Sequence, residues 1–134
     1  MNDSWLIKDL AIPKEELFRE LRRLGQFSAQ YMAEILPRAA WAAERVIIAT
    51  HVPPFSAACL HEGAPAHNDY LPHYVNQTMG EVLIRIAKEN PSVAFEVLAG
   101  HTHERCTVRI AANLEVRVAA ATPCHPQLES ILEL

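Results

Sequence analysis

The stretch VIIATHVPPF, residues 46–55, decides how this chain is interpreted. Its first four residues are all apolar, which is typical of a strand buried on both faces of a sheet. Pro53 and Pro54 then exclude a helix and make the exit from the strand rigid. His51 therefore follows a predicted strand over residues 46–50 and stands at a fixed corner, a placement that often serves a binding site.

A second predicted strand, residues 93–98, leads in the same way into GHTHE, residues 100–104. Gly100 allows a tight turn, and His101 and His103 point the same way if this segment is extended. In layered α/β folds, the carboxyl ends of the strands are the usual place for a site. Because neutral imidazole is a common metal ligand, the pattern predicts a metal cluster of His51, His101 and His103. The alternative for each is a hydrogen-bonded loop histidine.

The rest of the chain supplies the elements of a small α/β domain. Residues 13–36 have the apolar spacing of an amphipathic helix, with Pro13 at its start and Pro37 predicted to end it. A second helix is predicted over residues 78–88, and a hairpin over 106–111 and 115–121. Between the first strand and the second helix, residues 52–77 form a long predicted loop, which in a compact domain is usually functional or disordered.

Composition limits the class of protein. The chain has 134 residues, half of them apolar, and a formal net charge of −4, which suits a single domain over residues 1–134 and argues against a nucleic-acid surface. No apolar run approaches the ~20 residues of a membrane span, and the first ten residues lack the features of a signal peptide. Cys59, Cys106 and Cys124 show no CxxC spacing, which favours reduced thiols in the cytoplasm.

The motifs THVPPF (50–55) and AGHTHE (99–104) resemble the last two motifs of the calcineurin-like metallophosphoesterases. ACLHEG (58–63) and residues 69–83 between them look like bacterial members, so the resemblance covers residues 44–134. It implies a two-sheet α/β sandwich with two metal ions, and hydrolysis of phosphate esters by a metal-activated water. His51 and His101 would bind one ion and His103 would reach the other, with manganese, iron, zinc or nickel as the candidate metals.

The family's other motifs do not occur in this sequence. Asp-x-His, Gly-Asp-x-x-Asp and Gly-Asn-His are absent, and residues 1–43, a predicted helical segment, contain no histidine and only two aspartates, Asp3 and Asp9. The chain therefore resembles the carboxyl-terminal half of the domain, with one mixed sheet, flanking helices and about half of the sandwich. The family's catalytic histidine is missing, so no catalytic residue is assigned.

The missing carboxylates limit the expected activity. Two neighbouring dications need an anion to offset their repulsion, and three neutral histidines supply none. We expect the isolated chain to hold one metal or none and to be a weak or inactive phosphoesterase. A non-catalytic remnant and one half of a split enzyme are the alternatives. A sheet face and an edge left uncovered predict a homodimer or a partner with the missing half, unless helix 13–36 covers them.

The remaining candidate residues also have simpler explanations. His73 and Asp69 are predicted to contact a phosphorylated substrate, with exposed loop residues as the alternative. Cys124 and His125 suggest a thiolate nucleophile, but neighbours in the chain rarely form a working pair, and a buried loop cysteine is the simpler interpretation. Three arginines, Arg105, Arg109 and Arg117, fit a solvated outer face better than phosphate recognition.

Overall fold

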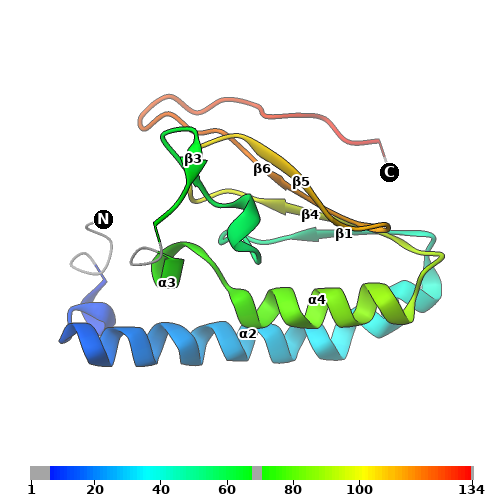
Figure 1. Cartoon of the computed structure of the whole chain (residues 1–134), viewed down its shortest axis with the longest axis horizontal. Coiled ribbons are helices and arrows are strands. Elements are labelled where there is room, and N and C mark those ends of the chain that lie inside the picture. The colour runs from blue at the N-terminus through cyan, green and yellow to red at the C-terminus, as the bar shows by residue number, and fades with distance from the viewer. Residues whose placement is uncertain (1–6, 68–70, 134) are drawn as a thin grey trace.

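The computed structural model describes residues 7–67 and 71–133. A four-stranded mixed sheet with the order β1-β4-β6-β5 forms its centre (Figure 1). Its strands are β1 (Arg45–Ala49), β4 (Ala94–Ala99), β5 (Cys106–Ala111) and β6 (Leu114–Val118). β1, β4 and β6 run parallel, and β5 is antiparallel to β6. The predicted α/β class with one mixed sheet and flanking helices is confirmed.

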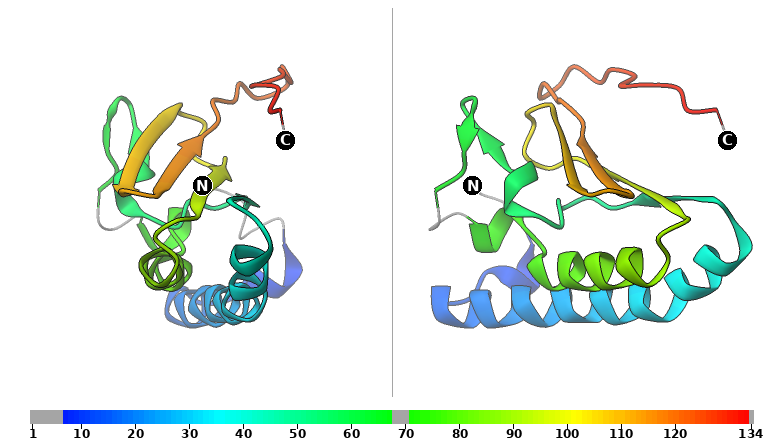
Figure 2. Two further views of the ribbon diagram at one scale, coloured as in Figure 1. Left: turned by 90° about the vertical axis from the view of Figure 1, so that its right-hand side faces the viewer. Right: turned by 45° about the vertical axis from the view of Figure 1, so that its right-hand side comes forward.

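Two long helices, α2 (Lys14–Ala42) and α4 (Gln77–Glu89), lie side by side on one face of this sheet (Figure 2). The core fills the space between the helices and the sheet. Its buried side chains come from both layers and include Leu36, Met79, Leu83, Ile86, Phe95, Val97, Leu114 and Val116. Because α2 lies on the same face as α4, it does not cover the opposite face of the sheet.

The first helix is longer than the sequence predicts. Pro37 was expected to end it, but α2 continues through this proline to Ala42. An interior proline removes one backbone hydrogen bond and costs about 3 kcal/mol. Leu36 and Ala40, which flank the proline, are 3% and 5% exposed, and their burial in the core offsets that cost. None of the helices in the described residues combines the length and hydropathy that crossing a bilayer requires.

β1 is an edge strand and is buried on one face only. Val46 and Ile48 point into the core, whereas Arg45 and Ala49 are exposed. The prediction of a strand buried on both faces was therefore wrong, because both helices lie on the same side of the sheet. The strand at 93–98 and the second helix at 78–88 are confirmed within one residue at each end. The second hairpin strand, predicted over 115–121, is β6 and ends at Val118.

The segment predicted as a long loop, residues 52–77, contains several short elements. The 3-10 helix η2 (Ser56–Ala58) is followed by a small hairpin of β2 (Leu60–His61) and β3 (Ala64–Pro65), and then by the single-turn helix α3 (Leu71–Tyr74). A further 3-10 turn, η1 (Lys8–Leu10), precedes α2. The hairpin is held from outside, because the Glu104 carboxylate accepts backbone hydrogen bonds from Glu62 and Gly63.

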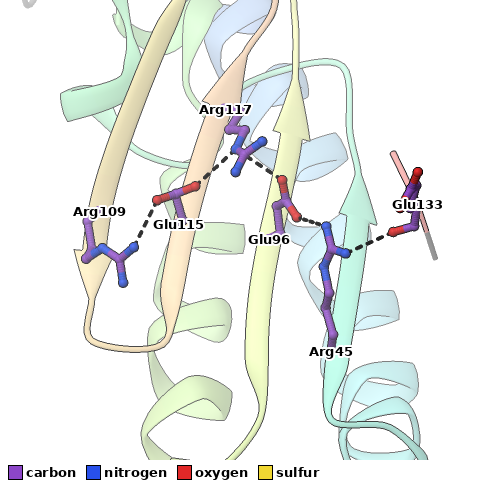
Figure 3. A network of polar contacts seen from close by, with 6 residues as sticks. All are labelled: Arg45, Glu96, Arg109, Glu115, Arg117 and Glu133. Carbon is purple, nitrogen blue, oxygen red and sulfur yellow. Dashed lines mark hydrogen bonds and ion pairs between the residues drawn. The ribbon is translucent and has the colours of Figure 1, made fainter. Parts of the chain in front are cut away.

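The face of the sheet opposite the helices carries a row of alternating charges, which Figure 3 shows from close by. At its centre the Glu96 carboxylate, in a residue only 7% exposed, lies 2.6 Å from the Arg45 guanidinium and 3.1 Å from that of Arg117. Arg117 and Arg109 each pair with Glu115, at 3.0 and 3.1 Å. This outer face is therefore charged across all four strands of the sheet, and it is not the apolar surface from which a dimer was expected.

Candidate functional site

Parallel pairing of β1 and β4 brings the two histidine motifs together. Ala49 pairs with Leu98 in the register of the two strands, and the segments that follow β1 and β4 leave the sheet at the same edge. The pairing continues past the strand ends, because the Thr50 amide donates to the Leu98 carbonyl at 2.9 Å and the Gly100 amide to the His51 carbonyl at 3.0 Å. Extended backbone hydrogen bonding thus fixes the start of both loops, and His51 and His101 meet.

The imidazole rings of His51 and His101 face each other through nitrogen atoms. His51 Nε2 and His101 Nδ1 are 3.1 Å apart, and the ring centroids are 4.8 Å apart at an angle of 69°. When two imidazole nitrogens bind the same zinc-sized ion, each at about 2.0–2.1 Å, the two nitrogens lie about 3–3.5 Å apart. The spacing of this pair therefore fits two ligands of a single ion.

A backbone carbonyl fixes the tautomer of His101. His101 Nε2 lies 3.0 Å from the carbonyl oxygen of His73, which can only accept a hydrogen bond. Nε2 must then carry the hydrogen, and in the neutral ring Nδ1 keeps its lone pair on the side of His51. Metal-binding histidines usually donate their second ring N–H to a carbonyl or carboxylate in this way. Without a metal, the His51 Nε2–H donates to His101 Nδ1.

The backbone of the GHTH segment adopts an uncommon conformation. His101 and His103 have φ angles of 70° and 63°, in the left-handed region where residues other than glycine are rare. Such residues cost free energy that the surrounding structure must offset, and they cluster at ligand-binding and active sites. The segment is therefore not extended, so the condition under which His101 and His103 would point the same way is not met.

The third predicted ligand, His103, stays apart from the pair. Its ring is exposed, and its backbone carbonyl accepts a hydrogen bond from the Ala121 amide. Among residues 7–67 and 71–133, no three histidine, cysteine or acidic side chains converge closely enough to hold a metal ion. Glu104, the nearest acid along the chain, uses its carboxylate on the hairpin amides. The described residues thus fit two ligands of one ion and do not fit a two-metal centre.

A large hollow lies beside this pair, between α2 and the segment that contains α3. Its volume is about 1250 Å³, and His51 and His73 form part of its lining. Much of the wall is apolar and comes from α2 and from the loop after β1, with Phe18, Leu21 and Phe55 as examples. The ring of His73 packs edge-on against Phe18 at 5.2 Å, and its partial burial lowers the pKa of the imidazole.

The remaining sequence candidates fall into three groups. Asp69 lies outside the described residues, whereas His73 lines the hollow, as a substrate contact would. Cys124 is exposed, so a buried loop cysteine is the wrong description of it. The arginines are engaged in ion pairs: Arg105 with Glu129, Arg109 with Glu115, and Arg117 with Glu96 and Glu115. Their predicted place on a charged outer surface agrees with the structure.

Sequence reasoning missed the residues that position the histidine pair. The backbone carbonyl of His73 carries no sequence signal, because any residue there would offer one. Tyr74, whose ring centroid is 5.2 Å from that of His101, follows from α3, an element that the sequence pattern did not predict. Glu104 was part of the quoted GHTHE motif, and an acid directly after the second histidine is the one signal that would have directed attention to it.

Comparison of the chain with protein-family models, with curated proteins and with solved structures gives no match. The resemblance to the metallophosphoesterases therefore rests on the sequence motifs alone. The geometry of the pair formed by His51 and His101 is an independent observation on the same residues.

Proposed function

We propose that the chain contributes the histidine side of a metal-dependent phosphoesterase, with His51 and His101 as two ligands of one divalent ion. The observation that carries the proposal is the 3.1 Å separation of His51 Nε2 and His101 Nδ1, together with the carbonyl that fixes the His101 tautomer. A bound divalent ion would supply Lewis-acid polarisation of a phosphoryl oxygen. Manganese, iron, zinc and nickel all accept imidazole ligands.

The chain's own groups would bind and orient the ester. His73 and the apolar wall of the hollow, including Phe18 and Leu21, offer a place for the organic part of the substrate. Arg22 lines the same hollow and brings a positive charge that suits a phosphate. Carboxylate ligands do not converge on the pair in the described residues, so full activity requires an acid from another segment or from a partner chain. With three free cysteines, we place the protein in the cytoplasm.

Metal content and hydrolysis test the proposal together. Zinc(II) or manganese(II) is titrated into the chelator-treated chain by calorimetry, and hydrolysis of bis(p-nitrophenyl) phosphate is then measured with each metal. We expect about one ion per chain, with binding lost in His51→Ala and in His101→Ala. His61→Ala is the matched control, because His61 is an exposed histidine in β2. Unchanged metal binding in both site variants would refute the assignment.

A second candidate function is a non-catalytic module that binds metal or a partner without hydrolysing esters. The observation in its favour is that Glu104, the acid next to the site, is bound to the hairpin amides of Glu62 and Gly63. Stoichiometric metal binding without hydrolysis of either mono- or diesters would select this alternative. Metal-dependent hydrolysis that disappears in His51→Ala would exclude it.

A further inference from the structure

The side of α2 that faces away from the sheet carries a regular row of exposed residues. We call it the outer stripe: Leu24, Phe27, Tyr31, Glu34, Arg38 and Trp41. These positions recur at alternating steps of three and four residues, which places them along one side of a helix. No other described element packs on this side of α2 (Figures 1 and 2).

The outer stripe exposes more apolar side chains than is usual for the solvent-facing side of a helix. Trp41 is 89% exposed, Phe27 68%, Tyr31 56% and Leu24 41%. Single exposed apolar residues are common, but four on one helix face, two of them among the largest side chains, indicate a contact surface. Tyrosine, tryptophan and phenylalanine are also the residues enriched at protein interfaces.

The residues of the outer stripe are placed symmetrically about the middle of the stripe, and the two members of each symmetric pair have side chains that can interact favourably. Leu24 and Trp41 lie equally far from the midpoint between Met32 and Ala33, as do Phe27 and Arg38, and Tyr31 and Glu34. In an antiparallel pair of α2 helices with a twofold axis at this midpoint, each residue therefore faces its counterpart in the other copy.

Each of the three facing pairs is favourable. Leu24 would pack on the indole of Trp41, the Arg38 guanidinium would lie over the ring of Phe27, and the Tyr31 hydroxyl would donate to the Glu34 carboxylate. Glu34 and Arg38 form no ion pair within residues 7–67 and 71–133, so pairing of the copies would not break one. A parallel arrangement would instead place Glu34 on Glu34 and Arg38 on Arg38.

From this complementarity we propose that the outer stripe is a self-association surface, occupied by the antiparallel α2 of a second copy of the chain. The proposal does not depend on the two histidines at the sheet edge, although Leu24 also forms part of the wall of the hollow beside them. It also replaces the uncovered sheet face as the basis for a dimer, since that face carries alternating charges. A single helix pair is at the small end of stable interfaces, so the dimer should dissociate on dilution.

Sedimentation velocity of the full chain over a wide concentration range is the first test. We expect a concentration-dependent dimer, with Phe27→Lys raising its dissociation constant by about tenfold or more, because it removes an aromatic contact and places a second positive charge against Arg38 of the other copy. Gln30→Lys is the matched control, since it adds the same charge at an exposed position on α2 outside the stripe. Far-UV circular dichroism checks that each variant is folded. A monomer at every concentration, or a dimer insensitive to Phe27→Lys, would overturn the proposal.

Cross-linking tests the antiparallel register. Two chains with different tags are prepared, one with Leu24→Cys and the other with Trp41→Cys. Both also carry Cys124→Ser, because the exposed Cys124 could form cross-links of its own. Oxidation should join position 24 to position 41 in the mixture. Either variant alone should remain uncross-linked, because identical positions would lie about 26 Å apart along the helix axis. Joining of position 24 to position 24 would contradict the antiparallel pair.

Discussion

The backbone carbonyl of His73 accepts a hydrogen bond from Nε2 of His101 at 3.0 Å, and so leaves Nδ1 of His101 directed at His51. One group without a sequence signal therefore decides which nitrogen of His101 is available to a ligand. The His101 ring faces His51 in a defined protonation state, which lowers the free-energy cost of ordering the two rings when a ligand binds.

This tautomer is directly observable by NMR. In the ¹⁵N-labelled chain at neutral pH, His101 should be the Nε2–H tautomer, with a pyridine-type chemical shift at Nδ1. Zinc(II) should move the Nδ1 resonance and leave the Nε2–H resonance in place, because the carbonyl still accepts that hydrogen. A His101 ring protonated at Nδ1 in the metal-free protein would contradict the structure.

Gly80 should be essential for the position of His51. A Cβ at this position of α4 would overlap the Pro54 carbonyl oxygen and come within 2.9 Å of the Phe55 ring, so Gly80→Ala must displace the corner that follows His51. We expect a loss of about 1–3 kcal/mol in the free energy of unfolding, measured in urea, together with weaker metal binding. Gly25→Ala is the control, because its Cβ would meet only the Asn76 side chain, at 3.1 Å. Equal stability of both variants would refute the tight contact.

Glu104 should act as a clamp on the hairpin of β2 and β3. Glu104→Ala removes the acceptor of the Glu62 and Gly63 amides, and these two amides should then exchange their hydrogens faster. Amide exchange followed by NMR gives the comparison, with Glu81→Ala, an exposed acid on α4, as the control. Protection of the two amides that persists in Glu104→Ala would show that the hairpin is held by other contacts.

The two arginines on Glu96 should be coupled. Arg45→Ala or Arg117→Ala alone leaves the Glu96 carboxylate with one guanidinium, whereas the double variant leaves a mostly buried charge unpaired. The double variant should therefore lose more stability than the sum of the single variants, with an interaction of roughly 0.5–2 kcal/mol. Urea unfolding of the four proteins measures this cycle. Additive losses would mean that solvent replaces the lost partners.

His73 should make stability depend on pH. Burial is the largest cause that lowers the pKa of its imidazole, and the positive charge of Lys14 lowers the pKa further. The unfolded chain therefore binds more protons between the lowered pKa and the ordinary value near 6.5, so stability falls as pH decreases through that window. His73→Gln should flatten the pH dependence of unfolding there, while His61→Gln should not. An unchanged slope in His73→Gln would exclude His73 as the titrating group.

Much of the sheet and the position of the site are visible in the sequence. The apolar runs before His51 and Gly100 identify β1 and β4, and their parallel pairing follows from the helix between them. The strand ends then bring His51 and His101 together. What the pattern could not supply are tertiary effects. Pro37 is accommodated in α2 because Leu36 and Ala40 are buried, and periodicity carries no information about that packing.

The separation of His103 from the other two histidines has a similar cause. Its expected side-by-side placement with His101 assumed an extended backbone, and the left-handed conformation of both residues changes the direction of their rings. Sequence spacing alone does not reveal a positive φ, because histidine is not a residue that requires one. The outer stripe of α2, by contrast, was available in the sequence, but its residues become an outward face only once α4 and the sheet are placed.

The left-handed backbone at His103 also sets which amino acids a redesign of this position can use. Asparagine, aspartate and histidine tolerate a φ near 63° far better than branched residues do. Aspartate and asparagine are thus replacements that the loop can accept at this position. The same geometry makes valine or isoleucine at this position a poor choice for any library. A directed-evolution library could therefore limit position 103 to a few polar residues and place most of its diversity at other positions.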